Sequence, residues 1–306
     1  MGQLRIGGFF AALAAQNETL KGLIARISGP HFFALTINLI FEANSKDSAM
    51  NIQLVRHATL RISLAGSTLL IDPILSPPGA NPPVANTANE KRNPLVPLPI
   101  ATAEVLRGVD AVLVTHTHRD HWDDAAAEAV PKHLPILCQP EDETKFRDWK
   151  FTDVRPIAVS IVWKKTVITR TGGRHGTGDI GKRMAPVSGF VLRTPGEPTL
   201  YIAGDTIWCD EVQSTLAAHS PDVIVVNAGE ARFREGDPIT MSAADVIATA
   251  QGAPSAAVIA VHLEAINHCG LPREGLRAQS RAAGLEHRIL IPNDGETLEI
   301  AMPVSA

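Results

Sequence analysis

Residues 111–123 read Ala-Val-Leu-Val-Thr-His-Thr-His-Arg-Asp-His-Trp-Asp, and this stretch constrains the chain more than any other. The apolar run 111–114 predicts a short buried strand. Three histidines and an aspartate follow it closely: His116, His118, Asp120 and His121. Imidazole and carboxylate groups suit zinc, iron and manganese. Alternate loop residues can face one side, so His116 and His118 can share one ion. Asp120 and His121 can reach a second ion, so the spacing indicates room for two metals.

The composition excludes some classes of partner. The chain has 306 residues, of which 45% are apolar and 20% are charged, as in soluble globular proteins. A net charge of -4 and the lack of a Lys/Arg cluster argue against a nucleic-acid partner and leave a small-molecule substrate. The three cysteines lie far apart without a C-x-x-C pair, which favours reduced thiols and a cytoplasmic location.

The first 49 residues differ from the rest. Their apolar runs, 9–15 and 31–41, are shorter than the stretch of about 18 residues that spans a bilayer, so we expect no membrane span. One interpretation of residues 1–49 is a secretory leader. The other, which we favour because a strand pattern begins at Met50, is an extension upstream of the natural start. We therefore expect residues 50–306 to form the functional domain.

From Met50 onward, strands come first and then alternate with helices. We predict strands at 52–55, 59–64, 67–72, 111–114, 135–138, 154–157, 159–163, 166–170, 187–193, 199–203, 222–226, 256–261, 288–291 and 297–301. We predict helices at 102–107, 123–130, 141–149, 209–219, 241–251 and 273–283. This order indicates an α/β (α+β) chain with two sheets packed face to face and helices outside. The loop 77–99 is long enough to form a wall of a substrate cleft, although a surface connection is an equal alternative.

Three further strand ends carry ligand-type side chains. His175 lies in the glycine-rich segment 171–181, whose backbone should bend freely. A phosphate-binding loop would need a following Lys-Ser/Thr, which is absent, so a metal ligand is the better interpretation of His175. Asp205 and His262 each follow an apolar strand, as the histidine loop does.

Taken in order, these strand-end residues resemble the ligand set of the metallo-β-lactamase superfamily over Met50 to the C-terminus. Within it, Arg56-His-Ala-Thr59, Leu70-Ile-Asp-Pro73 and Ala203-Gly-Asp-Thr206 resemble the branch of ascorbate-6-phosphate lactonase and N-acyl-phosphatidylethanolamine phospholipase D. The resemblance implies a four-layer αββα sandwich with a dinuclear site at one edge. It also implies a first ion on His116, His118 and His175, a second ion on Asp120, His121 and His262, and Asp205 as the bridge between them.

The resemblance further implies a hydrolase in which a hydroxide bridging two divalent ions cleaves a small ester, lactone or phosphodiester. Zinc is the expected metal, with manganese or iron as alternatives. We predict catalytic roles for Asp120, His57 and His268. For His57 a place beside the substrate and packing in the core are equally open. His268, which follows Glu264 and Asn267, is a candidate to protonate the leaving group, with surface hydrogen bonding as the alternative. The segment after His262 carries more polar side chains than we expect of the lactonase. We therefore do not infer that this chain shares the substrate of the lactonase.

Two other classes of function stay open. The same fold houses di-iron redox proteins, although a carboxylate-richer ligand set would be expected there. A non-catalytic metal-binding module is the other class, although a structural zinc site is normally closed by four ligands. Relatives often self-associate, which leaves a homo-oligomer open.

Overall fold

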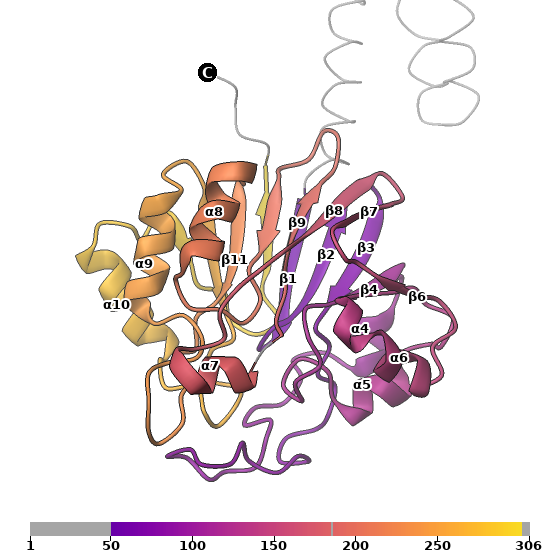
Figure 1. The fold of residues 1–306 in the computed structure, drawn as a ribbon, viewed down its shortest axis with the longest axis horizontal. Helices are drawn as coiled ribbons and strands as arrows, with labels where there is room; N and C mark the ends of the chain where they lie inside the picture. Colours follow the sequence, from indigo (N-terminus) through magenta and orange to yellow (C-terminus); the bar gives the residue numbers. More distant parts are fainter. Residues whose placement is uncertain (1–49, 185, 302–306) are drawn as a thin grey trace, which may run out of the picture. The chain divides into compact units, whose positions relative to one another are not determined.

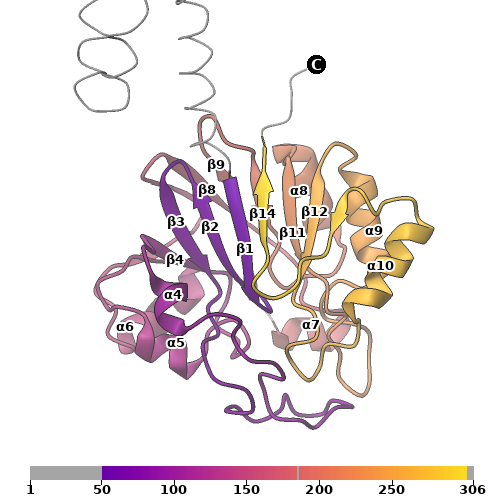
Figure 2. The same ribbon diagram turned by 180° about the vertical axis from the view of Figure 1, so that it is seen from behind.

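The computed structural model describes residues 50–184 and 186–301, and the predicted N-terminal extension, residues 1–49, lies outside them. Two mixed sheets of seven strands face each other (Figures 1 and 2). In spatial order, the first sheet contains β14 (Thr297–Ile300), β1 (Met50–Arg56), β2 (Thr59–Leu64), β3 (Ser67–Ile71), β4 (Ala111–Val114), β5 (Ile136–Cys138) and β6 (Val154–Pro156). The second sheet contains β13 (Ile289–Leu290), β12 (Ala257–Val261), β11 (Val223–Asn227), β10 (Leu200–Ile202), β9 (Gly189–Arg193), β8 (Thr166–Thr171) and β7 (Ser160–Trp163).

Side-chain alternation along the strands divides the core into layers. In β11, Val223 and Val225 join the core between the sheets, whereas Ile224 and Val226 join the core beneath the outer helices. Successive strand residues point to opposite faces, so a strand that is covered on both faces is apolar throughout, as β11 is. Each fully buried aliphatic side chain contributes about 1.5–3 kcal/mol relative to exposure, so these layers supply most of the stability of the frame that carries the strand-end loops.

Helices cover the outer face of each sheet (Figures 1 and 2). The first sheet is covered by α4 (Thr102–Leu106), α5 (Asp124–Ala129) and α6 (Glu143–Asp148), and the second by α8 (Asp210–His219), α9 (Ala243–Gly252) and α10 (Arg273–Ala282). Phe146 of α6 and Val246 of α9 are fully buried against their sheets. The start of α9 is fixed by a capping box between Ser242 and Asp245. The predicted αββα sandwich is confirmed.

The glycine-rich segment after β8 differs from the prediction. Its backbone bends as expected at Gly176 and Gly178, which have positive φ, but its last residues enter a short helix, α7 (Gly178–Met184), which has no buried side chain. Asp179 in its first turn and Lys182 and Arg183 in its last turn suit the helix dipole, which offsets the poor helix propensity of glycine. The predicted helix 141–149 likewise begins as a 3-10 turn, η1 (Pro140–Asp142), before α6.

None of the helices in the described part of the chain is both long and apolar enough to cross a membrane.

Candidate metal centre

The functional side chains follow strands that run in one direction. In the first sheet β1 and β3 are both antiparallel to β2, and β4 is parallel to β3. In the second sheet β8 and β10 are both antiparallel to β9, and β11 and β12 run parallel to β10. The carboxyl ends of such strands lie at one edge of their sheet, where ligands bind in open α/β sheets. Six of these strands lead into the site, and the residues that follow them are His57, Asp72, the segment 115–121, His175, Asp205 and His262.

The first predicted ligand group comes together as expected. One ring nitrogen from each of His116, His118 and His175 lies within 4.8 Å of the others. The Nε2 atom of His116 lies 2.9 Å from Nδ1 of His118. Zinc bonds to nitrogen at about 2.0–2.1 Å, so the donor atoms around a tetrahedral ion lie about 3.3 Å apart. The three rings are therefore close enough to bind one ion.

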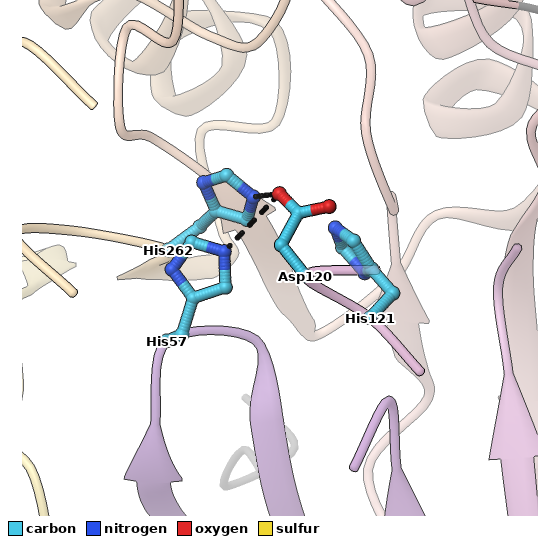
Figure 3. A group of neighbouring side chains, drawn as sticks. All are labelled: His57, Asp120, His121 and His262. Atoms are coloured by element: carbon cyan, nitrogen blue, oxygen red, sulfur yellow. Dashed lines mark ion pairs between the residues drawn. The ribbon is translucent and has the colours of Figure 1, made fainter. Parts of the chain in front are cut away.

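The second group contains one histidine more than predicted. Asp120, His121 and His262 are joined by His57, again with donor atoms within 4.8 Å of one another. Figure 3 shows His57 on the turn between β1 and β2, pointing at the same Asp120 oxygen as His262. That oxygen, Oδ2, lies 3.4 Å from Nε2 of His262 and 3.6 Å from Nε2 of His57.

Asp205 lies between the two groups. Its Oδ2 atom is 3.3 Å from Nε2 of His175 in the first group and 3.2 Å from Nε2 of His121 in the second. Its Oδ1 atom is 3.5 Å from Nε2 of His262 and accepts a 2.7 Å hydrogen bond from the side-chain amide of Asn227. One carboxylate therefore reaches donor atoms of both groups, and Asn227 fixes its orientation.

Several buried polar atoms at the centre of this cluster lack hydrogen-bond partners. They are Nε2 of His121, Nε2 of His262 and Oδ2 of Asp205. An unsatisfied buried polar group costs about 1–3 kcal/mol, so a fold rarely keeps several together without a further ligand. The Nε2 atoms of the histidines lie 3.2–3.8 Å from the carboxylate oxygens of Asp205. This spacing fits a divalent cation bound between them.

In three of the rings, those of His116, His121 and His175, the other nitrogen is held by a neighbour. Nδ1 of His121 lies 2.8 Å from Oδ2 of Asp72, and Nδ1 of His175 lies 2.8 Å from the carbonyl oxygen of Ile239. Nδ1 of His116 lies 3.1 Å from the Thr115 hydroxyl. Such partners fix the tautomer and the ring orientation of metal-binding histidines. The rings are therefore already turned with their free nitrogens toward the cluster.

Asp72 is a functional residue that the sequence reasoning missed. Its Oδ1 accepts from the backbone N–H of Thr115 at 2.7 Å, and its Oδ2 accepts from the Thr115 hydroxyl at 2.7 Å. Together with the bond to His121, these contacts tie both ligand groups to β3. The sequence marks Asp72 as the end of a strand and as part of the segment Leu70-Ile-Asp-Pro73 that carries the family resemblance, but it assigns no role to the side chain. An acidic residue at the end of an apolar strand, as at Asp205, was the signal that could have identified it.

Burial and mutual charge determine the protonation of the cluster. Burial alone would raise the pKa of Asp205, but the surrounding histidines, His121 above all, hold it well below its usual range. Burial, with help from neighbouring histidines, keeps the pKa of His116 well below its usual value. Burial would also lower the pKa of His262, but Asp205 and Cys269 raise it to about 10. Burial would lower the pKa of His121 too, but Asp205 and Asp72 raise it well above its usual value. The metal-free centre thus combines ionised carboxylates, neutral imidazoles such as that of His116, and protonated His121 and His262.

A cavity of about 350 Å³ opens onto the cluster. Its polar lining includes His118, Asp120, His175 and His268 at the cluster, and also Asn81, Asn93, Arg119 and Asp123. Its apolar walls include Ile74, Val84, Pro94, Met184, Phe233 and Ile266. The loop 77–99 contributes one wall, which favours the cleft wall over the surface connection, the two alternatives that the sequence left equally open.

The predicted catalytic histidines occupy different places. His268 lines the cavity with its Nε2 atom 3.6 Å from Oδ2 of Asp120. His57 is completely buried, is absent from the cavity lining, and has its ring centre 3.6 Å from that of His262. Its position favours an action through Asp120 and His262 over contact with a substrate. Glu264, which was considered beside His268, instead pairs with Arg273 at 2.6 Å.

Comparison with known proteins agrees with this arrangement. A family model described as "Beta-lactamase superfamily domain" matches residues 67–263. The UPF0173 protein YddR of Bacillus subtilis (strain 168) is 37% identical over 81% of this chain and 99% of its own length. The structure of an isothiocyanate hydrolase from Delia radicum gut bacteria is 38% identical, has a TM-score of 0.78, and is matched over 81% of this chain and 98% of its own. A possible metal-dependent hydrolase from Veillonella parvula DSM 2008 is 34% identical with a TM-score of 0.80, over 83% of this chain and 100% of its own.

Proposed function

The chain belongs to the beta-lactamase superfamily and is a metal-dependent hydrolase, and from this premise we propose that it works with two divalent ions. His116, His118 and His175 would hold one ion, and Asp120, His121 and His262 the other, with Asp205 between them. The position of Asp205 carries the proposal, because its Oδ2 lies 3.3 Å from a donor of one group and 3.2 Å from a donor of the other. Zinc is the metal we expect first, with manganese or iron as alternatives.

Two ions at this site would act as Lewis acids and lower the pKa of water toward neutrality, as in other two-metal hydrolases. The chain's own residues prepare the site for that chemistry. Asp72, Thr115 and Ile239 keep the histidine rings turned inward, and Asn227 fixes Asp205. The cavity brings a substrate against the same edge of the cluster and limits the water around it.

The charge of the cavity favours a neutral substrate. Among the described residues that line it, Arg119 alone is a Lys or Arg, and its guanidinium donates to Asp124 at 3.0 Å. A phosphodiester would therefore depend on the two metal ions alone to balance its charge, whereas a neutral ester or lactone needs no further cationic side chain. Of the bonds suggested by the sequence, we propose the ester or lactone over the phosphodiester.

An isothiocyanate is the second candidate substrate. It is favoured by the 38% identical relative, which is an isothiocyanate hydrolase, and by the mainly apolar cavity. Water would add to the carbon of R–N=C=S to give a thiocarbamic acid. Cleavage of its C–N bond would then release the amine and carbonyl sulfide.

His268 is the proposed source of the proton that the leaving group needs. It is the histidine of the polar cavity wall outside the proposed ligand set. In ester cleavage the acyl C–O bond breaks, and the departing oxygen takes a proton from Nε2. General acids of this kind typically contribute a factor of about 10²–10⁴ in rate.

Turnover of a small set of substrates tests the proposal. We would measure hydrolysis of 4-nitrophenyl acetate, a neutral γ-lactone, phenethyl isothiocyanate and the anionic bis(4-nitrophenyl) phosphate. A neutral substrate should be cleaved, and the activity should disappear on chelation and in His116→Ala. The exposed His133→Ala is the matched control and should keep full activity. Undiminished activity and metal content in His116→Ala would contradict the proposal. Visible absorbance with redox activity would favour the di-iron alternative, and metal-loaded protein that hydrolyses nothing would favour a binding module.

A further inference from the structure

The cavity wall formed by the loop 77–99 has almost no regular structure. Its only backbone pairing of the strand type among the described residues is the isolated bridge between Asn81 and Asn93. The polar side chain that this loop surrounds, Asn267, belongs to a different segment. Asn267 lies between Ile266 and His268, which both line the same cavity.

The side-chain amide of Asn267 bonds to the loop at several points. Its Oδ1 accepts from the backbone N–H of Val84 at 2.9 Å and from Nδ2 of Asn93 at 2.7 Å. Its Nδ2 donates to the Thr87 hydroxyl at 2.7 Å and to the carbonyl oxygens of Val84 and Asn89. The backbone N–H of Asn267 donates to Oδ1 of Asn93 at 2.9 Å.

These bonds use the full capacity of the amide and lie away from water. A carboxamide has two N–H donors and an oxygen with two lone pairs, and all are engaged here. Asn267 is 3% exposed, Thr87 2% and Asn93 5%. Because breaking one such bond leaves a buried group unsatisfied, a fully satisfied buried network holds a single arrangement.

The ends of the loop are pinned separately. The buried guanidinium of Arg56 donates to the carbonyl oxygens of Ile74 and Ser76 before the loop and of Val96 near its end. The N–H of Leu95 donates to the carbonyl oxygen of Ala265 at 2.7 Å. With its ends and its middle held, the loop is a preformed wall and not a lid that closes on substrate.

We propose that Asn267 is a positioning residue that locks the wall 77–99 and thereby sets the size of the apolar group that the cavity accepts. The locked segment presents Pro82, Pro83, Val84 and Pro94 to the cavity, and proline restricts the backbone further. The size limit rests on the proposed hydrolase function, whereas the locking of the wall does not.

Amide hydrogen exchange tests the lock in the metal-loaded full chain. The reporters are the N–H groups of Gly79, Asn81 and Leu95, which bond within the loop or to Ala265 and not to Asn267. In Asn267→Ala they should exchange at least about tenfold faster than in wild type. Thr87→Val, a milder change that removes one partner of the amide, should speed exchange in the same direction and guards against a misfolded Asn267→Ala.

Asn89→Ala is the matched control. Its side chain accepts only the N–H of Lys91 at 3.1 Å, and its backbone carbonyl, which Asn267 contacts, is unchanged by the substitution. It should leave exchange at the reporters within about twofold of wild type. Unchanged reporter exchange in both Asn267→Ala and Thr87→Val would overturn the lock.

Chain-length selectivity tests the size limit. We would compare kcat/KM for 4-nitrophenyl acetate, butyrate and hexanoate. In wild type the values should differ by at least about tenfold, because a fixed pocket discriminates by about 1–3 kcal/mol per methylene. In Asn267→Ala the differences in kcat/KM among the three esters should become smaller, mainly through changes in KM. The metal content should stay at the wild-type level. The same spread in both proteins would overturn the size limit. If wild type cleaves no ester, the proposed function fails for esters. Amide hydrogen exchange would still show whether Asn267 locks the wall 77–99.

Discussion

Replacing Asp72 by asparagine perturbs the centre without replacing a proposed ligand. Asp72 is 1% exposed and accepts from the Thr115 N–H, the Thr115 hydroxyl and Nδ1 of His121. Its backbone has a φ of 41°, in the left-handed region, which asparagine tolerates as well as aspartate does. Asp72→Asn therefore changes the hydrogen bonding and the charge and leaves the backbone unstrained.

The size of the effect follows from the geometry. If the amide nitrogen replaces Oδ1, it faces the N–H of Thr115, and if it replaces Oδ2, it faces the Thr115 hydroxyl and His121. Either way one bond is lost and a donor is left buried, at a cost of about 1–3 kcal/mol. Loss of a partner behind a metal-binding histidine typically weakens metal affinity by about 10–100-fold, or about 1.4–2.8 kcal/mol. We therefore expect zinc affinity to fall by about 10–100-fold.

Competition with a chromophoric chelator measures this affinity. Asp123→Asn is the matched control, because Asp123 is also a buried carboxylate nearby but accepts only from the backbone N–H groups of Leu75, Ser76 and Ala126. It should lower the free energy of unfolding by about 1 kcal/mol and leave zinc affinity unchanged. Equal zinc affinity in Asp72→Asn and wild type would refute the reasoning.

Four further outcomes follow from the contacts. The pKa of His262 is raised to about 10 in the metal-free chain, above its ordinary 6.5. The stability that His262 contributes to metal-free protein should therefore be complete below pH 6.5 and be lost toward pH 10, which urea unfolding with chelator present would measure. Zinc uptake near neutral pH should accordingly release protons, which calorimetry in buffers of different ionisation enthalpy would detect. Ser242→Ala breaks the capping box of α9 and should lower the free energy of unfolding by about 1 kcal/mol while activity is kept. Phe190→Ala should cost about 3–5 kcal/mol by urea unfolding, because this side chain is fully buried between the sheets.

The fold was predictable because its strongest signals are local. Runs such as 111–114 and 256–261 are apolar on both faces, and the structure buries them between the other sheet and the outer helices. The ligand-type residues that follow these strands could be grouped into one predicted site, because the carboxyl ends of parallel strands lie at one edge of a sheet. The structure places all seven predicted ligands in the cluster, while their binding of metal stays a prediction.

Contacts between distant segments could not be predicted in the same way. Asn267 bonds to residues more than 170 positions away, and nothing in the polar sequence around it indicates that partner. The joining of His57 to the second ligand group depends on the packing of the β1–β2 turn against the loop after β12. The helix α7 was missed because its five-glycine surroundings have low helix propensity, whereas its charges suit the helix ends.

Metal content per chain tests the central claim most directly. Elemental analysis of protein purified without added metal should find about two divalent ions per wild-type chain, with clear loss in His116→Ala and in Asp205→Ala. One ion or none, with a content that Asp205→Ala does not change, would contradict the bridging role of Asp205 and the dinuclear centre with it.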